Sequence, residues 1–170
     1  MSTEQADFDR NTAELLEHVL EKGFQLGSCL GSALFAPLSV YKGRHSGTSL
    51  SPRLLRVLSK SALVGTGVAG LLGVGRVYGT PLTPDGVEDR VCRLRHNLGQ
   101  NRTDKFSRIG LVAGAAISAA QYGITGSSLL GGAAFGTSIG ILAHVATYQG
   151  AEKGLKTGPA NMVEELKHSD

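Results

Sequence analysis

A chain of 170 residues has room for one compact domain. Its formal net charge is only +3, and without Trp and with few aromatic rings for stacking bases it does not resemble a nucleic-acid-binding protein. Gly is the informative residue type, because 24 glycines are about twice the ordinary share and most of them lie inside apolar runs. The basic residues flank those runs, as expected of groups at a membrane surface.

The first 22 residues predict an amphipathic helix that precedes the membrane domain. Asn11 or Thr12 can cap this helix, and Gly23 is expected to end it. Its apolar stripe consists of Leu15, Leu16, Val19 and Leu20. The acidic residues of segment 1–10 fit neither a secretory signal nor a mitochondrial presequence, so we expect any organelle targeting to be internal.

Two membrane spans are predicted next. Segment 23–41 contains no charged residue and is close to the roughly 20 residues needed to cross a bilayer core. A polar linker, 42–60, follows it with five basic residues and no acidic one. The second span covers about 57–78, since Lys60 and Arg76 at the ends of the uncharged run 61–75 can snorkel to the surface.

The loop 79–108 is predicted to contain a surface helix over about 86–98. Asp85 and Glu88 have the spacing of a capping box, and Gly99 is the expected end. Its apolar face would consist of Val87, Val91, Leu94 and Leu98. We expect this helix to lie flat at the membrane, with arginines near an anionic phospholipid such as cardiolipin or near acidic partner residues: Arg90, Arg93 and Arg95.

The uncharged run 109–151 is too long for one span and predicts two, joined by a tight turn at 123–128. The predicted fold is therefore all-α, an integral membrane bundle of four Gly-rich transmembrane helices. It divides into an amphipathic segment 1–22, a membrane domain 23–151 and a polar tail 152–170. A buried soluble bundle is the alternative, which three charge-free runs in one short chain disfavour.

Glycines recur at about every third or fourth position in the spans. Such stripes allow two helix backbones to approach closely within a membrane. The predicted packing positions are Gly27, Gly31, Gly67, Gly70, Gly73, Gly110, Gly114, Gly132, Gly136 and Gly140. They can serve packing within the chain, docking onto another membrane subunit, or both.

Residues that could carry chemistry are sparse. The spans contain only Gln25, Gln121 and His144 as candidate polar groups for a pore, and no two histidines have metal-ligand spacing. We therefore expect no catalytic residues, no cofactor and no metal. Cys29 and Cys92 are expected on the same side of the membrane, which leaves a disulfide and two free thiols both open.

This layout resembles the family of mitochondrial inner-membrane preprotein translocase core subunits, which also includes a chloroplast-envelope amino-acid pore and an accessory subunit of respiratory complex I. The resemblance covers about 23–151. It rests on four Gly-striped spans, a basic first loop, a closing hairpin and the placement of the two cysteines. Arg102 and Asp104, ahead of the Gly110 and Gly114 stripe, resemble a degenerate form of the family's Arg–Asp motif.

The resemblance implies a disulfide between Cys29 and Cys92 in the intermembrane space. With the basic first loop in the matrix, both termini would also lie in the intermembrane space. Our first hypothesis is a non-catalytic accessory subunit of respiratory complex I, partnered by other membrane subunits of that assembly. The alternative is a component of an inner-membrane protein translocase or a small-solute pore.

Overall fold

The computed structural model describes residues 3–44, 50–79 and 82–148, and every element in these ranges is a helix. The predicted all-α class is confirmed. In chain order the elements are α1 (Thr3–Leu30), the π-helical turn η1 (Gly31–Phe35), α2 (Ala36–Arg44), α3 (Leu50–Gly79), α4 (Pro84–His96), α5 (Leu98–Tyr122) and α6 (Gly126–Thr147).

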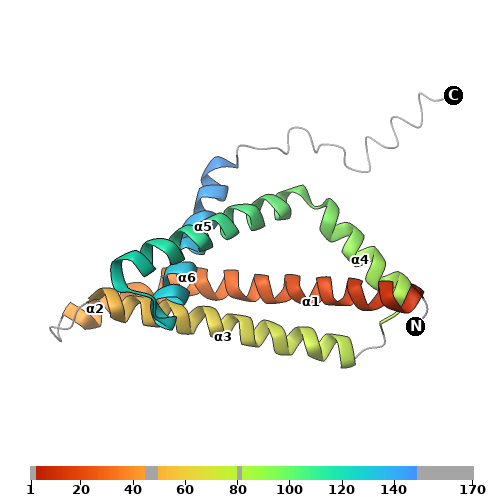
Figure 1. Ribbon diagram of the computed structural model, residues 1–170, viewed down its shortest axis with the longest axis horizontal. Helices are drawn as coiled ribbons and strands as arrows, with labels where there is room; N and C mark the ends of the chain where they lie inside the picture. The colour runs from red at the N-terminus through yellow and green to blue at the C-terminus, as the bar shows by residue number, and fades with distance from the viewer. Residues whose placement is uncertain (1–2, 45–49, 80–81, 149–170) are drawn as a thin grey trace.

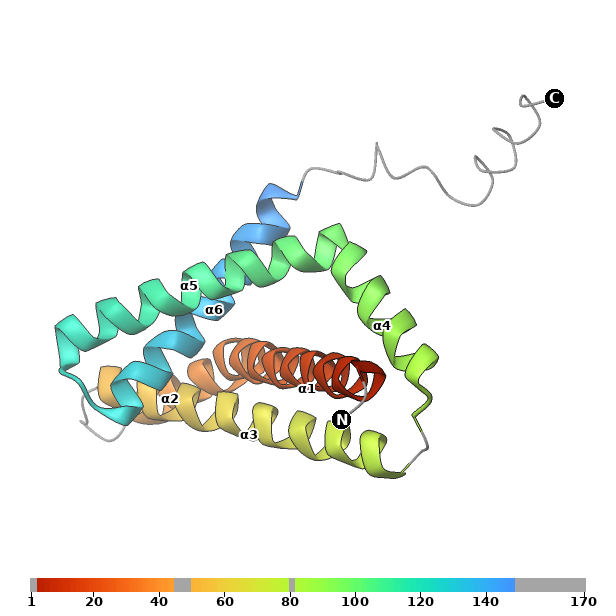
Figure 2. The same cartoon turned by 45° about the vertical axis from the view of Figure 1, so that its right-hand side comes forward.

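The helices form two antiparallel pairs that α4 connects along the chain, and α6 packs against α3 and α1 to hold the two pairs together. Figure 1 shows α1 and α3 running side by side, while α5 and α6 form the second pair across them. α4 leads from the end of α3 to the start of α5 and contacts the N-terminal half of α1, as both views show (Figure 1 and Figure 2). This arrangement brings the first half of α5 next to α1.

The N-terminal amphipathic segment and the first predicted span are one continuous helix, so the predicted stop at Gly23 is wrong. Gly23 packs against the Gly65 backbone and the Ala69 side chain, where any larger residue would collide. The glycine therefore serves a close helix contact instead of a helix end. Most of the predicted linker 42–60 is also helical, because α2 extends to Arg44 and α3 begins at Leu50; residues 45–49 lie outside the described ranges.

Pro37 follows a widened turn within the continuous helix formed by α1, η1 and α2. Proline has no N–H to donate to the carbonyl four residues earlier, and its ring crowds that carbonyl. The chain accommodates it with the π-helical turn η1, in which the Ala36 N–H donates to the Gly31 carbonyl. The helix thus continues past the proline towards Tyr41.

α4 begins with a cap that the sequence interpretation missed. The Thr83 hydroxyl accepts from the Gly86 N–H at 3.2 Å, and Pro84 occupies the first turn, so the predicted Asp85–Glu88 capping box is wrong. The helix ends at His96 instead of Leu98, because Asn97 caps α5 by accepting from the Gln100 N–H at 3.1 Å. Val87 and Val91 are buried as expected.

The turn between the last two helices lies where the sequence placed it. Gly123 ends α5 with a φ of +80°, a conformation that favours glycine, and α6 starts at Gly126. α5 itself starts at Leu98, well before the predicted start of the third span at Ile109. Its first half therefore carries charged residues.

Large apolar side chains point outwards and small ones inwards. Many Leu, Val and Ile residues of the described helices are exposed, for example Leu71 and Val145, whereas the buried side chains are largely Ser, Thr and Ala. Three helical segments are long and apolar enough to cross a membrane: 3–41, 52–77 and 126–147. Within the described residues α5 is not among them.

The α1–α3 contact has a defined register. Gly31 lies against Ser61 at one end of it, and Gly23 lies against Ala69 at the other. Between them Gly27 packs on the backbone of Ala62 and Gly65. The contact therefore pairs the start of the uncharged run 23–41 with the start of the run 61–75.

Candidate functional site: a polar cluster between α1 and α5

Five polar residues meet where α5 crosses α1, and we call them the polar cluster: His18, Lys22 and Gln25 from α1, with Asp104 and Ser107 from α5. The α1 residues share one helix face because they are spaced by four and three positions, as are the two α5 residues at a spacing of three. Gln25, Asp104 and Ser107 are buried. The cluster lies at the N-terminal end of the uncharged run of α1.

Asp104 is the centre of the hydrogen bonds. Its Oδ1 atom forms an ion pair with Lys22 Nζ and accepts from Gln25 Nε2 at 2.8 Å. Gln25 Nε2 also lies 2.8 Å from Ser107 Oγ, and the Ser107 hydroxyl donates to the Asp104 carbonyl at 3.0 Å. Lys22 Nζ donates to Gln25 Oε1 at 3.0 Å. Polar groups this well satisfied join two helices strongly in an apolar setting.

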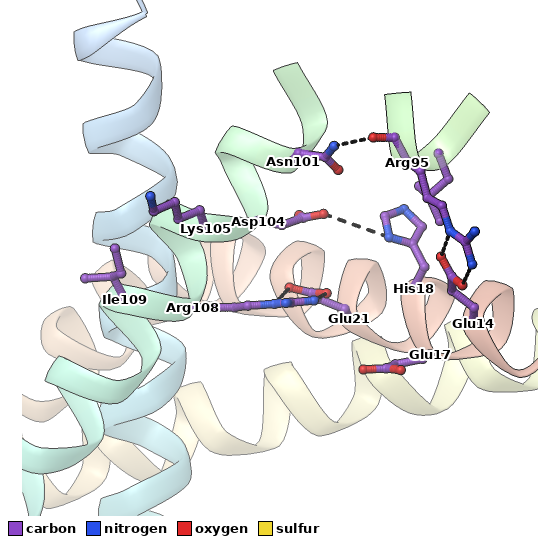
Figure 3. A pocket seen from close by; sticks show the side chains of 11 residues that line it. Glu14, Glu17, His18, Glu21, Arg95, Asn101, Asp104, Lys105, Arg108 and Ile109 are labelled. Carbon is purple, nitrogen blue, oxygen red and sulfur yellow. Dashed lines mark hydrogen bonds and ion pairs between the residues drawn. The ribbon is translucent and has the colours of Figure 1, made fainter. Parts of the chain in front are cut away.

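His18 stands on the open side of the cluster. Its Nδ1 atom faces Asp104 Oδ2 at 3.9 Å (Figure 3), which is too long for a hydrogen bond. On the other side of the ring, Nε2 contacts the side-chain amide of Gln100. The His18 ring therefore contacts two residues of α5, Gln100 in its first turn and Asp104 one turn further on.

Two arginine–glutamate pairs border the cluster (Figure 3). Arg95 of α4 donates to both carboxylate oxygens of Glu14, at 2.9 and 2.5 Å, and Arg108 of α5 does the same to Glu21, at 2.9 and 2.6 Å. These hydrogen bonds raise the pKa of both guanidinium groups above the ordinary value. Both arginine side chains are more than half exposed, whereas their partners Glu14 and Glu21 are only 33% and 17% exposed. Each two-point pair therefore orients α4 or α5 against α1.

A hollow of about 470 Å³ opens between the cluster and its border. Figure 3 shows the side chains of His18, Glu21, Asp104 and Arg108 between α1 and α5, whereas Lys105 and Ile109 point away from them. The ligand-type atoms of His18, Glu21 and Asp104 lie within 4.8 Å of one another beside it. Both carboxylates already pair with cationic side chains, so the three donors are not free to hold a metal ion.

A protein-family model described as "Protein of unknown function (DUF1757)" matches residues 2–148. The chain belongs to the DUF1757 family. The match spans all the described helices and both halves of the polar cluster. A comparison with curated proteins found no match.

The glycines of this DUF1757 chain divide into those at helix contacts and those that face open space. A side chain at Gly110 or Gly136 would meet the backbone of the other, and Gly114 has the same relation to Gly132. Gly140 lies against the Phe106 carbonyl. α5 and α6 therefore approach at backbone distance along this row.

On the α1–α3 side the contacts differ from the predicted stripe. Gly27 and Gly31 face α3, where Gly27 packs on the backbone of Ser61, Ala62 and Gly65 and Gly31 packs on Ser61. The predicted stripe omitted Gly65. Gly67 has nothing within contact distance. Gly70 and Gly73 meet only apolar side chains of α1.

The disulfide implied by the resemblance is absent, since Cys29 and Cys92 are both free. Cys92 shares a small hollow with Asp7 and Asn11 near the start of α1. Asn11 and Cys29 are 18 positions apart on one helix, which corresponds to about 27 Å at 1.5 Å per residue. A disulfide requires Cα atoms within roughly 7 Å, so these two thiols are too far apart.

The other predicted site residues are placed as follows. Arg95 pairs with Glu14, and Arg93 pairs with Asp89 of its own helix at 2.7 Å, while Arg90 is exposed. Arg102 does not join the polar cluster with Asp104 but lies over the rings of Phe106 and Tyr148.

His144 is buried in α6. Its ring packs against Phe106 and Tyr148, and its Nδ1 atom has no hydrogen-bond partner.

Proposed function

We propose that this protein is a non-catalytic accessory subunit of respiratory complex I in the mitochondrial inner membrane, where it acts as a helix-packing scaffold. The observation that carries this proposal is the reversed distribution of side chains. Glycine, serine and alanine fill the contacts between helices, while large apolar residues cover the outside. A surface of this kind needs lipid or apolar protein around it.

The internal contacts support a scaffold. α5 and α6 are joined at backbone distance along Gly110, Gly114 and their partners, and α1 and α3 are joined along Gly27 and Gly65. α6 packs the second pair against α3 and α1, and the polar cluster adds hydrogen bonds between α1 and α5. Such a bundle has a fixed shape and presents its outer apolar residues to neighbours.

The choice of complex I rests on the resemblance of the layout to the translocase family and its complex I branch. The basic first loop supports a topology in which both termini lie in the intermembrane space. Exposed Arg90 and Arg93 on α4 are suited to cardiolipin head groups or acidic partner residues.

Native purification tests the proposal. The full-length chain, carrying an affinity tag and extracted in mild detergent, should co-migrate with complex I subunits on a native gel. Recovery of the tagged chain alone, or with translocase subunits, would contradict the assignment.

The second candidate is a component of a protein translocase or a small-solute pore. It is favoured by the buried hydroxyls of Ser28 and Thr137, which have no hydrogen-bond partner and lie on α1 and α6. Reconstitution into liposomes distinguishes the two, because a pore gives ion or amino-acid flux and a scaffold gives none.

A further inference from the structure

We propose that a phospholipid with an anionic head group binds in the groove between α3 and the η1–α2 segment. Its phosphate would lie at Lys60 and Arg53 of α3, and an acyl chain would lie against Phe35 and Leu38 on the opposite wall. The groove has a volume of about 500 Å³. The site requires a membrane location but no particular complex, and it lies at the end of α3 opposite α4 and its arginines.

The groove combines basic and apolar side chains on facing walls. On the η1–α2 side, Phe35 and Leu38 are 49% and 56% exposed. On the α3 side, Arg53 and Lys60 lie beside Val64, which is 65% exposed. In a membrane the apolar wall needs hydrocarbon around it, whereas the basic side chains need an anion or water. A phospholipid supplies a phosphate and a hydrocarbon chain in one molecule.

The charge at this end of the molecule favours an anionic head group. Between Glu21 and Asp85 the sequence has no acidic residue. Arg56 and Lys60 are exposed and one turn apart on α3, and no acidic side chain of the described residues pairs with either. Lys and Arg bind phosphate through charge-assisted hydrogen bonds. A zwitterionic lipid adds an ammonium group that these residues repel, so an anionic lipid is preferred.

A second hollow continues the groove along the α1–α3 contact. The two hollows share Phe35, Ser61 and Val64. The second has a volume of about 480 Å³ and runs beside Gly27 and Gly65, which have no side chains to fill it. From Lys60 to Val68 is about 12 Å of helix, most of the roughly 15 Å of hydrocarbon in one leaflet. The hollow reaches Lys22 only beyond that point, so an acyl chain fits before the next charge.

Photolabelling of the unmodified chain locates the lipid. The full-length protein is reconstituted in phosphatidylcholine vesicles with a small share of phosphatidylglycerol that carries a diazirine on one acyl chain. The label should be found at Phe35, Leu38 or Val64, and added phosphatidylglycerol should compete with it better than phosphatidylcholine does. Labelling confined to other helices, or equal competition by the two lipids, would overturn the proposal.

Two lysine variants test the head-group contact. Lys60→Gln and Lys105→Gln each remove one exposed lysine, from α3 and from α5. Lys60→Gln should weaken competition by phosphatidylglycerol about fivefold, and Lys105→Gln should leave it unchanged. An equal loss in both variants would mean that net charge attracts the lipid, which would overturn the site.

Two valine variants test the acyl-chain contact. Val64 and Val145 are 65% and 64% exposed, so a larger side chain at either position leaves the helix contacts intact. Val64→Phe fills the groove and should remove most of the labelling at Phe35 and Leu38, whereas Val145→Phe, on α6, should not. Full labelling of Val64→Phe would contradict the acyl-chain position. Release of the unmodified chain from membranes by alkaline carbonate would instead contradict the membrane location itself.

Discussion

Asp104 connects three side chains of α1 to α5, because Lys22 and Gln25 bond to one carboxylate oxygen and His18 faces the other. Asp104→Ala would leave the Lys22 ammonium without its ion-pair partner in a partly buried position. We expect the free energy of unfolding to fall by about 1–2 kcal/mol. Thermal unfolding in detergent, followed by circular dichroism, measures this change.

Glu88→Gln is a matched control for that substitution, since it also removes an acidic charge but from the exposed surface of α4. We expect its effect to stay within about 0.5 kcal/mol. If the free energy of unfolding fell by the same amount in both variants, Asp104 would not hold α1 to α5.

The two cysteines give a second prediction at the level of single residues. Because Cys29 and Cys92 are free and distant from each other, unreduced protein should react with a maleimide at both thiols after denaturation. In the folded protein Cys92 should react faster, since it is exposed and Cys29 is only partly so. Labelling that requires prior reduction would instead support the intermembrane-space disulfide.

At the level of helices, α3 contains a natural comparison between two glycines. Gly65 faces α1, where a methyl group would collide with the Gly23 carbonyl and the Gly27 backbone, whereas Gly67 faces open space. We expect Gly65→Ala to destabilise the protein by about 1–3 kcal/mol. Gly67→Ala should be neutral or stabilising by up to about 1 kcal/mol, because alanine favours helix more than glycine does.

Unfolding midpoints of the two variants, measured side by side, check this prediction. The substitutions are chemically identical and lie within one turn of the same helix, so a general effect of alanine cancels. Equal midpoints would mean that α1 and α3 do not pack through Gly65.

Sequence patterns located most helices but not their contacts. The uncharged runs and the Gly123 turn predicted the long helices because both signals are local. The prediction that Gly23 ends the first helix was wrong. In a sequence, a glycine that ends a helix cannot be told from a glycine at a close helix–helix contact until its partner, here Gly65, is known. The resemblance drew attention to Asp104, but its partners Lys22 and Gln25 lie about 80 positions away and no local spacing identifies them.

For the whole molecule, the three long apolar helical segments predict firm membrane insertion. After alkaline carbonate extraction of isolated membranes, the chain should stay in the pellet while peripheral proteins are released. Its exposed leucines and valines, such as Leu71 and Val145, would otherwise face water. Release into the supernatant would favour the soluble bundle.

The register of α1 against α3 has a consequence for the surrounding bilayer. The two uncharged runs overlap only between the Gly31–Ser61 and Gly23–Ala69 contacts, which is about 13 Å of helix. A hydrocarbon core is about 30 Å thick. If both helices cross the membrane, this hydrophobic mismatch has to be met by thinning the lipid around the pair or by drawing Lys22 and Lys60 towards the head groups. The protein would then fit a thin membrane at lower cost than a thick one.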